Sequence, residues 1–207
     1  MFKNLVYKNP NKYLIRKKNF IRDFSSLYKN IKDPWNQNKN FKNEETIIFS
    51  LDIIDRLAKK KKNKISLLDI GAGSGSLKKI LNNKIKYVGT DIHKRKFKHI
   101  IYDNIEIHNP KFVNKFDIIV CFKTIYYLGD KIKIVIQNMK KYLRKNGYLF
   151  ISYNLKKKSF SNRYLTDLKL RKILKKHFFE IYTVEINREI SETNNKIEKN
   201  TLFVFKK

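Results

Sequence analysis

The chain has few of the residues that would place it in several large classes of protein. Its 207 residues include one cysteine, three prolines and six glycines. A single cysteine, Cys121, cannot form an internal disulfide and fits a reducing compartment. No run of about 18 or more apolar residues occurs, which argues against a membrane-spanning helix, and the N-terminus lacks the apolar stretch of a signal peptide. We therefore expect a cytoplasmic protein.

Acidic residues are also scarce, and their scarcity gives the chain a formal charge of +30. Such a charge raises the possibility of a nucleic-acid partner. However, only 8 of the 48 basic residues are arginine, the side chain that best recognises bases and phosphates. Asn and Ile are enriched alongside Lys, as biased codon usage would produce. Nucleic acid is therefore a possible partner but not a favoured one, and a basic exterior would in any case attract anionic substrates.

Three of the six glycines fall within five residues, at Gly71, Gly73 and Gly75. They follow an apolar run that ends in Asp69 and Ile70, and a second short apolar run ends in Asp91, twenty residues after Gly71. A strand, a glycine loop and a helix form the opening of an adenosine-binding α/β domain. A dinucleotide fingerprint would need glycine at Ser76. The acid before the loop suits a ligand with an ammonium group instead.

This arrangement resembles motif I of the class I S-adenosylmethionine-dependent methyltransferases, whose pattern is D/E-x-G-x-G-x-G. The resemblance implies that S-adenosylmethionine is the cofactor. It also implies that Asp69 and the Gly71–Gly75 backbone, including Ala72, hold the methionine half, with Asp91 on the ribose and Ile92 on the adenine. The family often places an acid after the next strand, where Asp103 and Asn104 stand. An ordinary turn is an equal interpretation of that Asp-Asn pair.

The order of predicted elements favours a Rossmann-like, doubly wound α/β sheet of about seven strands, mostly parallel with an antiparallel C-terminal strand. We divide the chain into a basic N-terminal arm, residues 1–42, which would cover the active site, and a methyltransferase domain, residues 43–207. Strands are predicted at 65–70, 87–91, 99–102, 116–122, 148–153, 178–185 and 201–206. Helices are predicted at 19–30, 44–62, 77–81, 131–143 and 166–176, with Thr166 as an N-cap and Gly147 ending a connection.

The segment 116–128 resembles the loop that faces both cofactor and acceptor in small-molecule methyltransferases. By that resemblance Phe122 and Lys123 line the cofactor, while Tyr126 and Tyr127 lie nearer the acceptor. Half-buried helix packing is the alternative for the tyrosines. No N/D-P-P-Y/F/W or Pro-Cys segment follows this strand, so nucleobase methylation of those types is not indicated. Cys121 is expected to be a small core residue. The four histidines show no metal-ligand spacing, and we predict no metal.

Asp33-Pro34-Trp35 resembles the D-P-W segment of the methyltransferase group that includes the nodulation protein S type, which methylates an amino sugar. An aromatic ring beside an acid can bind a sugar, although a turn anchored by Trp35 is the alternative.

The sequence therefore predicts methyl transfer to a small-molecule or glycan-linked acceptor by in-line displacement. Asp33, Tyr126, Tyr127 and Asp130 are the weak candidates for a catalytic base. An RNA methyltransferase and a non-catalytic S-adenosylmethionine-binding protein are the alternatives. The sequence specifies neither the acceptor atom nor the oligomeric state.

Overall fold

A computed structural model describes residues 11–16, 19–31, 33–34, 41–93, 97–155, 165–189 and 197–207. In the N-terminal part lie α1 (Asn11–Leu14), β1 (Ile15–Arg16), β2 (Asn19–Phe20), α2 (Phe24–Asn30) and η1 (Phe41–Asn43). The rest of the chain contains α4 (Glu45–Lys60), β3 (Ile65–Ile70), η2 (Ser76–Lys79), β4 (Ile85–Asp91), β5 (Ile100–Tyr102), η3 (Pro110–Phe112), β6 (Phe116–Phe122), η4 (Ile125–Leu128), α5 (Ile132–Tyr142), β7 (Leu143–Leu155), α6 (Asp167–Lys175), β8 (Phe179–Glu189) and β9 (Ile197–Lys206).

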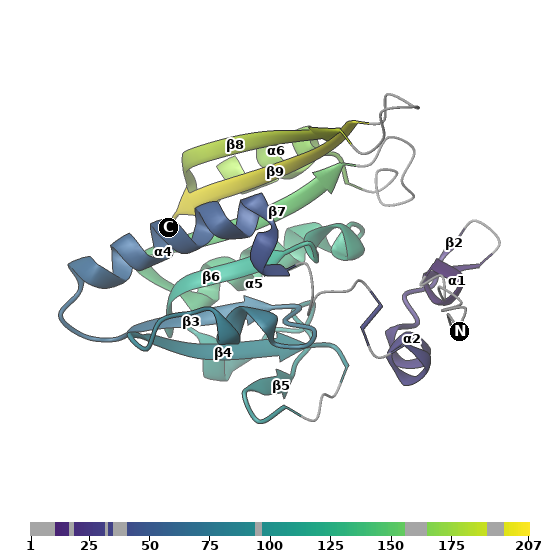
Figure 1. The fold of residues 1–207 in the computed structure, drawn as a ribbon, viewed down its shortest axis with the longest axis horizontal. Helices are drawn as coiled ribbons and strands as arrows, with labels where there is room; N and C mark the ends of the chain where they lie inside the picture. Colours follow the sequence, from purple (N-terminus) through teal and green to yellow (C-terminus); the bar gives the residue numbers. More distant parts are fainter. Residues whose placement is uncertain are drawn as a thin grey trace, which may run out of the picture.

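Seven strands form one sheet in the order β5-β4-β3-β6-β7-β9-β8 (Figure 1). The first five of these are parallel, and β9 runs antiparallel to both β7 and β8. The predicted fold class is therefore confirmed. The chain moves outward from β3 to β4 and β5, then returns to the other side of β3 with β6. This reversal of strand order places the switch point, where α/β sheets bind ligands, between β3 and β6.

Apolar residues fill both faces of the sheet, because consecutive residues of a strand point to opposite sides. One core lies between the sheet and helices α5 and α6, and it includes Leu68 and Ile119. The other core packs α4 against the opposite face and includes Leu67 and Ile118. Cys121 is fully buried in β6, as predicted. The two covered faces hold the carboxyl ends of β3, β4 and β6 in fixed positions.

Several local predictions agree with the structure. Strands β3 and β6 have the predicted bounds, and α5 and α6 match theirs within one residue at each end. The Thr166 hydroxyl caps α6 by accepting a hydrogen bond from the Lys169 amide at 3.2 Å.

Three local predictions were wrong. The crossover after the glycine loop is the short η2, and not a helix over 77–81, because Asn82 turns the chain by accepting from the Lys84 amide. Helix α2 begins at Phe24 rather than at residue 19, because Arg22 has a φ of 52° and Asp23 caps the helix. Gly147 lies inside β7, which begins at Leu143, and does not end the connection.

None of the helices in the described part of the chain has the length and apolar character needed to cross a lipid bilayer. Likewise, no group of three or more His, Cys, Asp or Glu side chains is arranged to hold a metal ion within those same ranges.

Candidate functional site

The loop after β3 has a backbone that only glycine adopts without strain. Gly71, Gly73 and Gly75 have φ values of 75°, 56° and 71°. A Cβ on Gly71 would lie 2.3 Å from the Thr124 Oγ1 atom, which belongs to the loop after β6. The loops that follow β3 and β6 therefore touch at the switch point, and the space around Gly71 allows backbone alone. Ala72 is buried beside it, and its amide donates to the Thr90 carbonyl at 2.9 Å.

Asp69 is a buried carboxylate at the end of β3, with 5% of its surface exposed. Its Oδ2 atom accepts a hydrogen bond from the Tyr87 hydroxyl of β4 at 2.8 Å. Burial raises the pKa of Asp69 to about 7, the Tyr87 hydrogen bond opposes this, and the Asp91 charge adds to it. Burial and the Asp69 charge also raise the pKa of Tyr87 above its usual value. Asp69 is thus a carboxylate that a cationic ligand would stabilise.

Asp91, at the end of β4, joins the glycine loop to the next connection. Its Oδ2 atom accepts from the Gly73 amide and its Oδ1 atom from the His93 amide, each at 2.9 Å. A carboxylate has about four acceptor positions, and hydroxyl groups such as those of a ribose are suitable donors to it. Ile92, the next residue, is 44% exposed and offers an apolar side chain at the same strand end.

The third strand end supplies Asp103 and Asn104, both half-buried. The Asp103 amide donates to the Asp91 carbonyl at 3.1 Å, which brings the two strand ends together. Asp103 Oδ1 accepts from Asn109 Nδ2 at 2.8 Å, while Asn104 Oδ1 accepts from the Glu106 amide at 3.0 Å. Burial raises the pKa of Asp103. The contact between Asn104 and the Glu106 amide forms the turn that was the alternative interpretation of the Asp103-Asn104 pair. Asp103 nevertheless lies beside Asp91.

Beyond β6, Lys123 has a positive φ of 51°, and its amide donates to the Ser152 hydroxyl at 3.0 Å. Its ammonium group pairs with the Glu44 carboxylate, next to the start of α4, at 2.7 Å. Phe122, the last residue of β6, is buried.

The rings of the two tyrosines after β6 contact one another, with centroids 4.4 Å apart and planes tilted by 60°. Tyr126 also meets Tyr153 edge-on at 6.2 Å, and Tyr127 meets Phe24 of α2 edge-on at 5.3 Å. Both tyrosines are half-buried, which agrees with the packing alternative without excluding contact with an acceptor.

Arg22 ties the N-terminal part of the chain to loops at this end of the sheet. Its guanidinium donates to both Asp130 oxygens at 3.0 Å, to Glu106 at 2.5 Å and to the Tyr127 carbonyl at 3.4 Å. Tyr28 of α2 stacks on His93 with centroids 5.4 Å apart. Figure 1 shows α2 beyond the carboxyl ends of β3 and β4. Asp33 is half-buried, whereas Trp35 lies outside the described residues.

Sequence reasoning missed several residues of this end of the molecule. Tyr87 was counted as one apolar residue of a strand, and nothing local marks its hydroxyl as the partner of Asp69. Arg22 and Glu106 are 84 positions apart, and their pairing depends on the tertiary fold. Glu44 was identified only as the start of a helix, and its ion pair with Lys123 was not predicted. The roles of these residues depend on contacts between segments that are separated in the sequence. A local sequence pattern does not contain such contacts.

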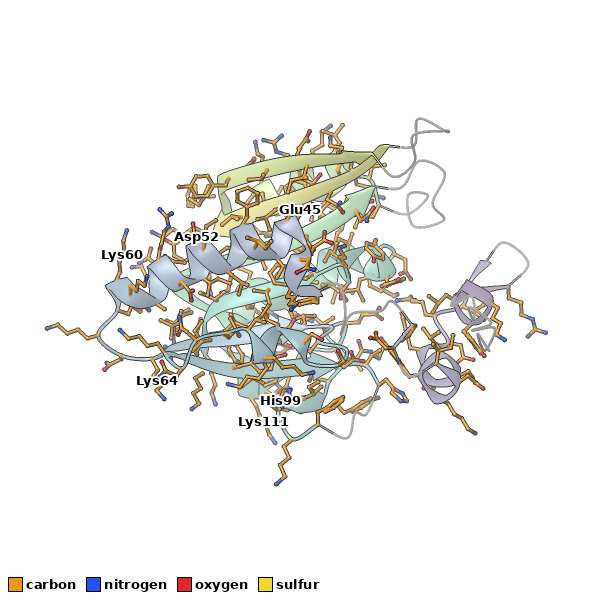
Figure 2. All side chains as sticks on the ribbon, viewed as in Figure 1. Glu45, Asp52, Lys60, Lys64, His99 and Lys111 are labelled. Atoms are coloured by element: carbon orange, nitrogen blue, oxygen red, sulfur yellow. The ribbon has the colours of Figure 1, made fainter. Side chains whose placement is uncertain are left out.

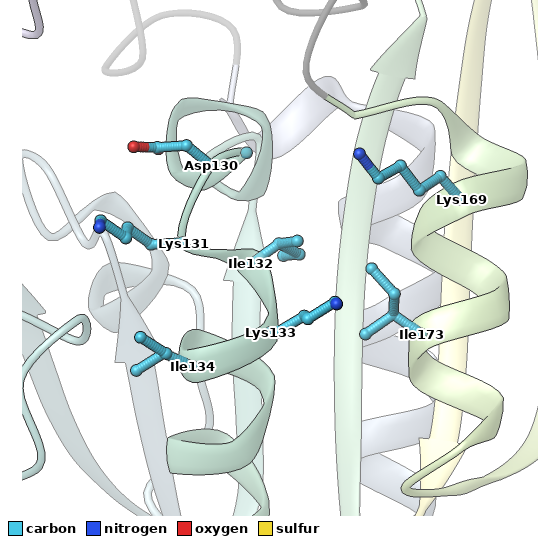
Figure 3. A pocket seen from close by; sticks show the side chains of 8 residues that line it. Asp130, Lys131, Ile132, Lys133, Ile134, Lys169 and Ile173 are labelled. Carbon is cyan, nitrogen blue, oxygen red and sulfur yellow. The ribbon is translucent and has the colours of Figure 1, made fainter.

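A cavity of about 440 Å³ lies between the start of α5 and helix α6, beside the Tyr126–Tyr127 loop rather than at the glycine loop. Its lining includes Asp130, Ile132, Lys133, Lys169 and Ile173. Figure 3 shows the Lys133 and Lys169 side chains directed toward the space between the two helices, with Ile132 and Ile173 beside them. The cavity thus combines an apolar lining with positive charge.

Residues 42–200 match the sequence model of the methyltransferase domain family. No curated protein matches the chain significantly. Among solved structures, the N-methyltransferase NodS from Bradyrhizobium japonicum WM9, in complex with S-adenosyl-L-homocysteine, is similar over 97% of each chain, with 18% identity and a TM-score of 0.62.

Two further similar structures extend the range of reactions. The CurJ carbon methyltransferase has 17% identity and a TM-score of 0.59, over 96% of this chain and 61% of CurJ. The [4+2]-cyclase SpnF has 14% identity and a TM-score of 0.58, over 75% of this chain and 80% of SpnF. At these identities the likeness establishes the fold alone, and the cyclase illustrates that one fold supports more than one reaction.

Proposed function

This chain belongs to the methyltransferase domain family, and from that premise we propose that it transfers a methyl group from S-adenosylmethionine to a small-molecule or glycan-linked acceptor. The observation that carries the proposal is the junction of Asp69, the glycine loop and Asp91 at the switch point of the sheet. These groups lie within one hydrogen-bonded unit, because Gly73 donates to Asp91 and Thr90 accepts from Gly71. The family match independently supports the same chemistry.

The site has the donors and acceptors that the proposed cofactor requires. Asp91 would accept the ribose hydroxyls, and Asp69 would pair with the ammonium of the methionine part. The backbone at Gly71, Ala72, Gly73 and Gly75 would lie against the ligand, which the positive-φ glycines permit. The adenine would lie near Ile92, Asp103 and Asn104, with Phe122 and Lys123 on the β6 side. S-adenosylmethionine supplies a methyl carbon bonded to a positively charged sulfur.

The main contribution of this chain to the reaction would then be to position the acceptor against the methyl group. Displacement at a sulfonium develops no oxyanion, so catalysis depends on holding the acceptor within about 3–3.5 Å of the methyl carbon and excluding water. The N-terminal arm, held by Arg22 and by α2, would exclude water from this side. A base is needed only if the acceptor must lose a proton. Asp33, Tyr126, Tyr127 and Asp130 stay the candidate bases, and Asp130 accepts two hydrogen bonds from Arg22.

Two features support an elongated, polar acceptor. The Tyr126 and Tyr127 rings, which contact one another, offer an aromatic surface next to the cofactor region, and aromatic rings cover the C–H faces of sugars. The cavity lined by Lys133 and Lys169 lies beside the same loop and would favour an acceptor with a negatively charged portion. NodS, an N-methyltransferase, is similar along almost the whole chain. The Asp33-Pro34-Trp35 segment keeps Trp35 as a candidate contact of the acceptor.

Transfer of a labelled methyl group to defined acceptors tests the proposal. The purified full chain would be incubated with methyl-labelled S-adenosylmethionine and, separately, with amino-sugar oligosaccharides, with small amines and with total RNA. We expect label in the oligosaccharide or amine fraction. Label in RNA alone would support the alternative of an RNA methyltransferase, which the charge and the basic arm suggest. Cofactor binding without label in any fraction would support a non-catalytic role.

A further inference from the structure

One end of the molecule is positively charged and almost free of acids. Five segments lie at or just before the amino ends of β3, β4, β6, β7 and β8, and a sixth lies at the carboxyl end of the antiparallel strand β9. These segments are 60–64, 84–86, 111–115, 140–145, 175–177 and 206–207, and we call them together the basic face. Every segment carries at least two Lys or Arg residues, and none contains Asp or Glu. Figure 2 shows Lys60 and Lys64 at one end of the molecule, whereas Glu45 lies at the other end of α4.

Hydrogen bonds and ion pairs join four of these segments into one surface. Lys207 Nζ donates to the Leu143 carbonyl at 2.6 Å and to Asn114 Oδ1 at 3.3 Å. The Lys115 amide donates to the Tyr142 carbonyl at 3.0 Å. Lys61 and Arg144 meet at the shared carboxylate of Asp117, at 2.7 and 3.2 Å. Residues far apart in the sequence thus place their charges side by side.

The charges are close enough to repel one another. Burial lowers the pKa of Lys207, and the neighbouring Lys140 lowers it further. The pKa of His177 is lowered by burial and then by Lys140 and Lys176. The nearest acids are already engaged, because Asp117 pairs with Lys61 and Arg144, while Glu180 pairs with Arg171 and Lys175. A uniformly biased composition accounts for many lysines, but in the part of the chain that the structure describes, Asp117 and Glu180 at this end are also already paired.

We propose that the basic face docks the protein on the anionic surface of a lipid bilayer. Phe179, at the start of β8, is 78% exposed, and Val113, between Lys111 and Lys115, is 39% exposed. Apolar side chains among lysines are typical of surfaces that lie at a membrane interface. A nucleic acid is less favoured, because the cations are almost all lysine and Arg144 is occupied by Asp117. The lysines supply attraction without a specific phosphate geometry.

The basic face lies at the opposite end of the strands from the glycine loop. Strand β4 has seven residues, which at about 3.3 Å each separates the two ends by about 20 Å. A bilayer on the basic face would therefore leave the candidate site and α2 directed away from the lipid. Docking would localise the protein without occupying the site, and it does not depend on which acceptor the enzyme methylates.

Vesicle co-sedimentation of the full chain tests the proposal. We expect binding to phosphatidylcholine vesicles with about 30% phosphatidylglycerol at about 50 mM salt, none to pure phosphatidylcholine, and loss of binding at about 0.5 M salt. In the triple variant Lys62→Glu, Lys145→Glu, Lys176→Glu, the partition coefficient should fall by about 100-fold or more, since each lysine contributes separately. These three side chains are exposed, so the variant should keep its thermal midpoint and its binding of S-adenosylhomocysteine.

The matched control is Lys29→Glu, Lys42→Glu, Lys78→Glu, which changes the net charge equally at exposed positions outside the basic face. The control should lose far less vesicle binding. The proposal is overturned if the wild-type chain does not bind the anionic vesicles, or if both triple variants lose binding equally. It is also overturned if the basic face binds a short single-stranded RNA while the vesicles fail to bind, which would assign the face to nucleic acid instead.

Discussion

Asp69 and Tyr87 show how a single hydrogen bond prepares a carboxylate for a cationic ligand. The Tyr87 hydroxyl opposes the effect of burial, which by itself favours the protonated acid. Replacing Tyr87 by Phe removes that donor, so the pKa of Asp69 should rise further and the carboxylate should be less ionised at pH 7. We expect about 10-fold weaker S-adenosylmethionine binding at pH 7, with recovery at higher pH. Calorimetric titrations at several pH values would measure the affinity of wild type and variant for S-adenosylmethionine. A loss of affinity that does not depend on pH would contradict this explanation.

The same carboxylate should cost stability when no ligand is bound. Its folded pKa, about 7, lies above the unfolded value, so the folded chain holds a proton that the unfolded chain has released. This group therefore reduces the free energy of unfolding as pH rises from about 4 to about 7. Asp69→Asn should raise the thermal midpoint of the ligand-free protein at pH 8 and should weaken S-adenosylhomocysteine binding. A lower thermal midpoint of Asp69→Asn than of wild type at pH 8 would contradict this, because it would show that the ionised Asp69 stabilises the ligand-free fold.

At the scale of the elements, Asp117 joins the start of three strands. It lies on β6, and it accepts from Lys61, from Arg144 of β7 and from both the amide and the hydroxyl of Ser66 in β3. Burial would raise its pKa, but the hydrogen bonds from Lys61 and Ser66 outweigh that effect and hold it at about 2. Removal of the charge should therefore loosen the junction of α4, β3, β6 and β7.

We expect Asp117→Asn to reduce the free energy of unfolding at pH 7 by about 2 kcal/mol, because hydrogen bonds to a charged group are lost. The stabilisation is present above the unfolded pKa of about 4 and disappears as pH falls toward 2. The difference between wild type and variant should accordingly shrink at low pH. Urea unfolding at pH 7 and at pH 3 measures both values, and a difference that does not depend on pH would exclude the ionic explanation.

The N-terminal arm depends on Arg22 more than on any propensity of its own, since α2 has only seven residues. Arg22→Ala removes the contacts with Glu106 and Asp130 and should release α2. Chymotrypsin should then cleave near Phe24 and Tyr28 about 10-fold faster, because local opening costs less free energy. Arg16→Ala is the control, since Arg16 is an exposed arginine of the same arm. Equal cleavage rates in the two variants would show that Arg22 does not hold the arm.

At the scale of the whole molecule, the sheet was predictable because its central strands are recognisable from their own residues. The runs 65–70 and 116–122 are almost continuously apolar, as buried parallel strands require, and the glycine loop follows the first of them directly. The place of Cys121 inside the second of these runs also predicted its burial. These features depend on neighbours in the sequence, so the sequence alone was enough to find them.

The contacts around the site were not predictable in the same way. The Arg22 pairs with Glu106 and Asp130 and the Lys123 pair with Glu44 join segments that the sequence separates widely. The crossover after the glycine loop was overestimated as a helix because apolar spacing at 77–81 outweighed the turn at Asn82. The basic face was likewise invisible, since it is assembled from six segments that each resemble ordinary lysine-rich loops.

Isothermal titration with S-adenosylmethionine, using wild type, Asp91→Ala and Asp52→Ala, tests the central claim most directly. Asp91 lies in the proposed ribose site, whereas Asp52 is an exposed carboxylate on α4 that pairs with Arg56. The account predicts that wild type and Asp52→Ala bind alike, and that Asp91→Ala binds about 10- to 100-fold more weakly through loss of charge-assisted hydrogen bonds. Absence of binding to the wild type, or equal binding by Asp91→Ala, would contradict it.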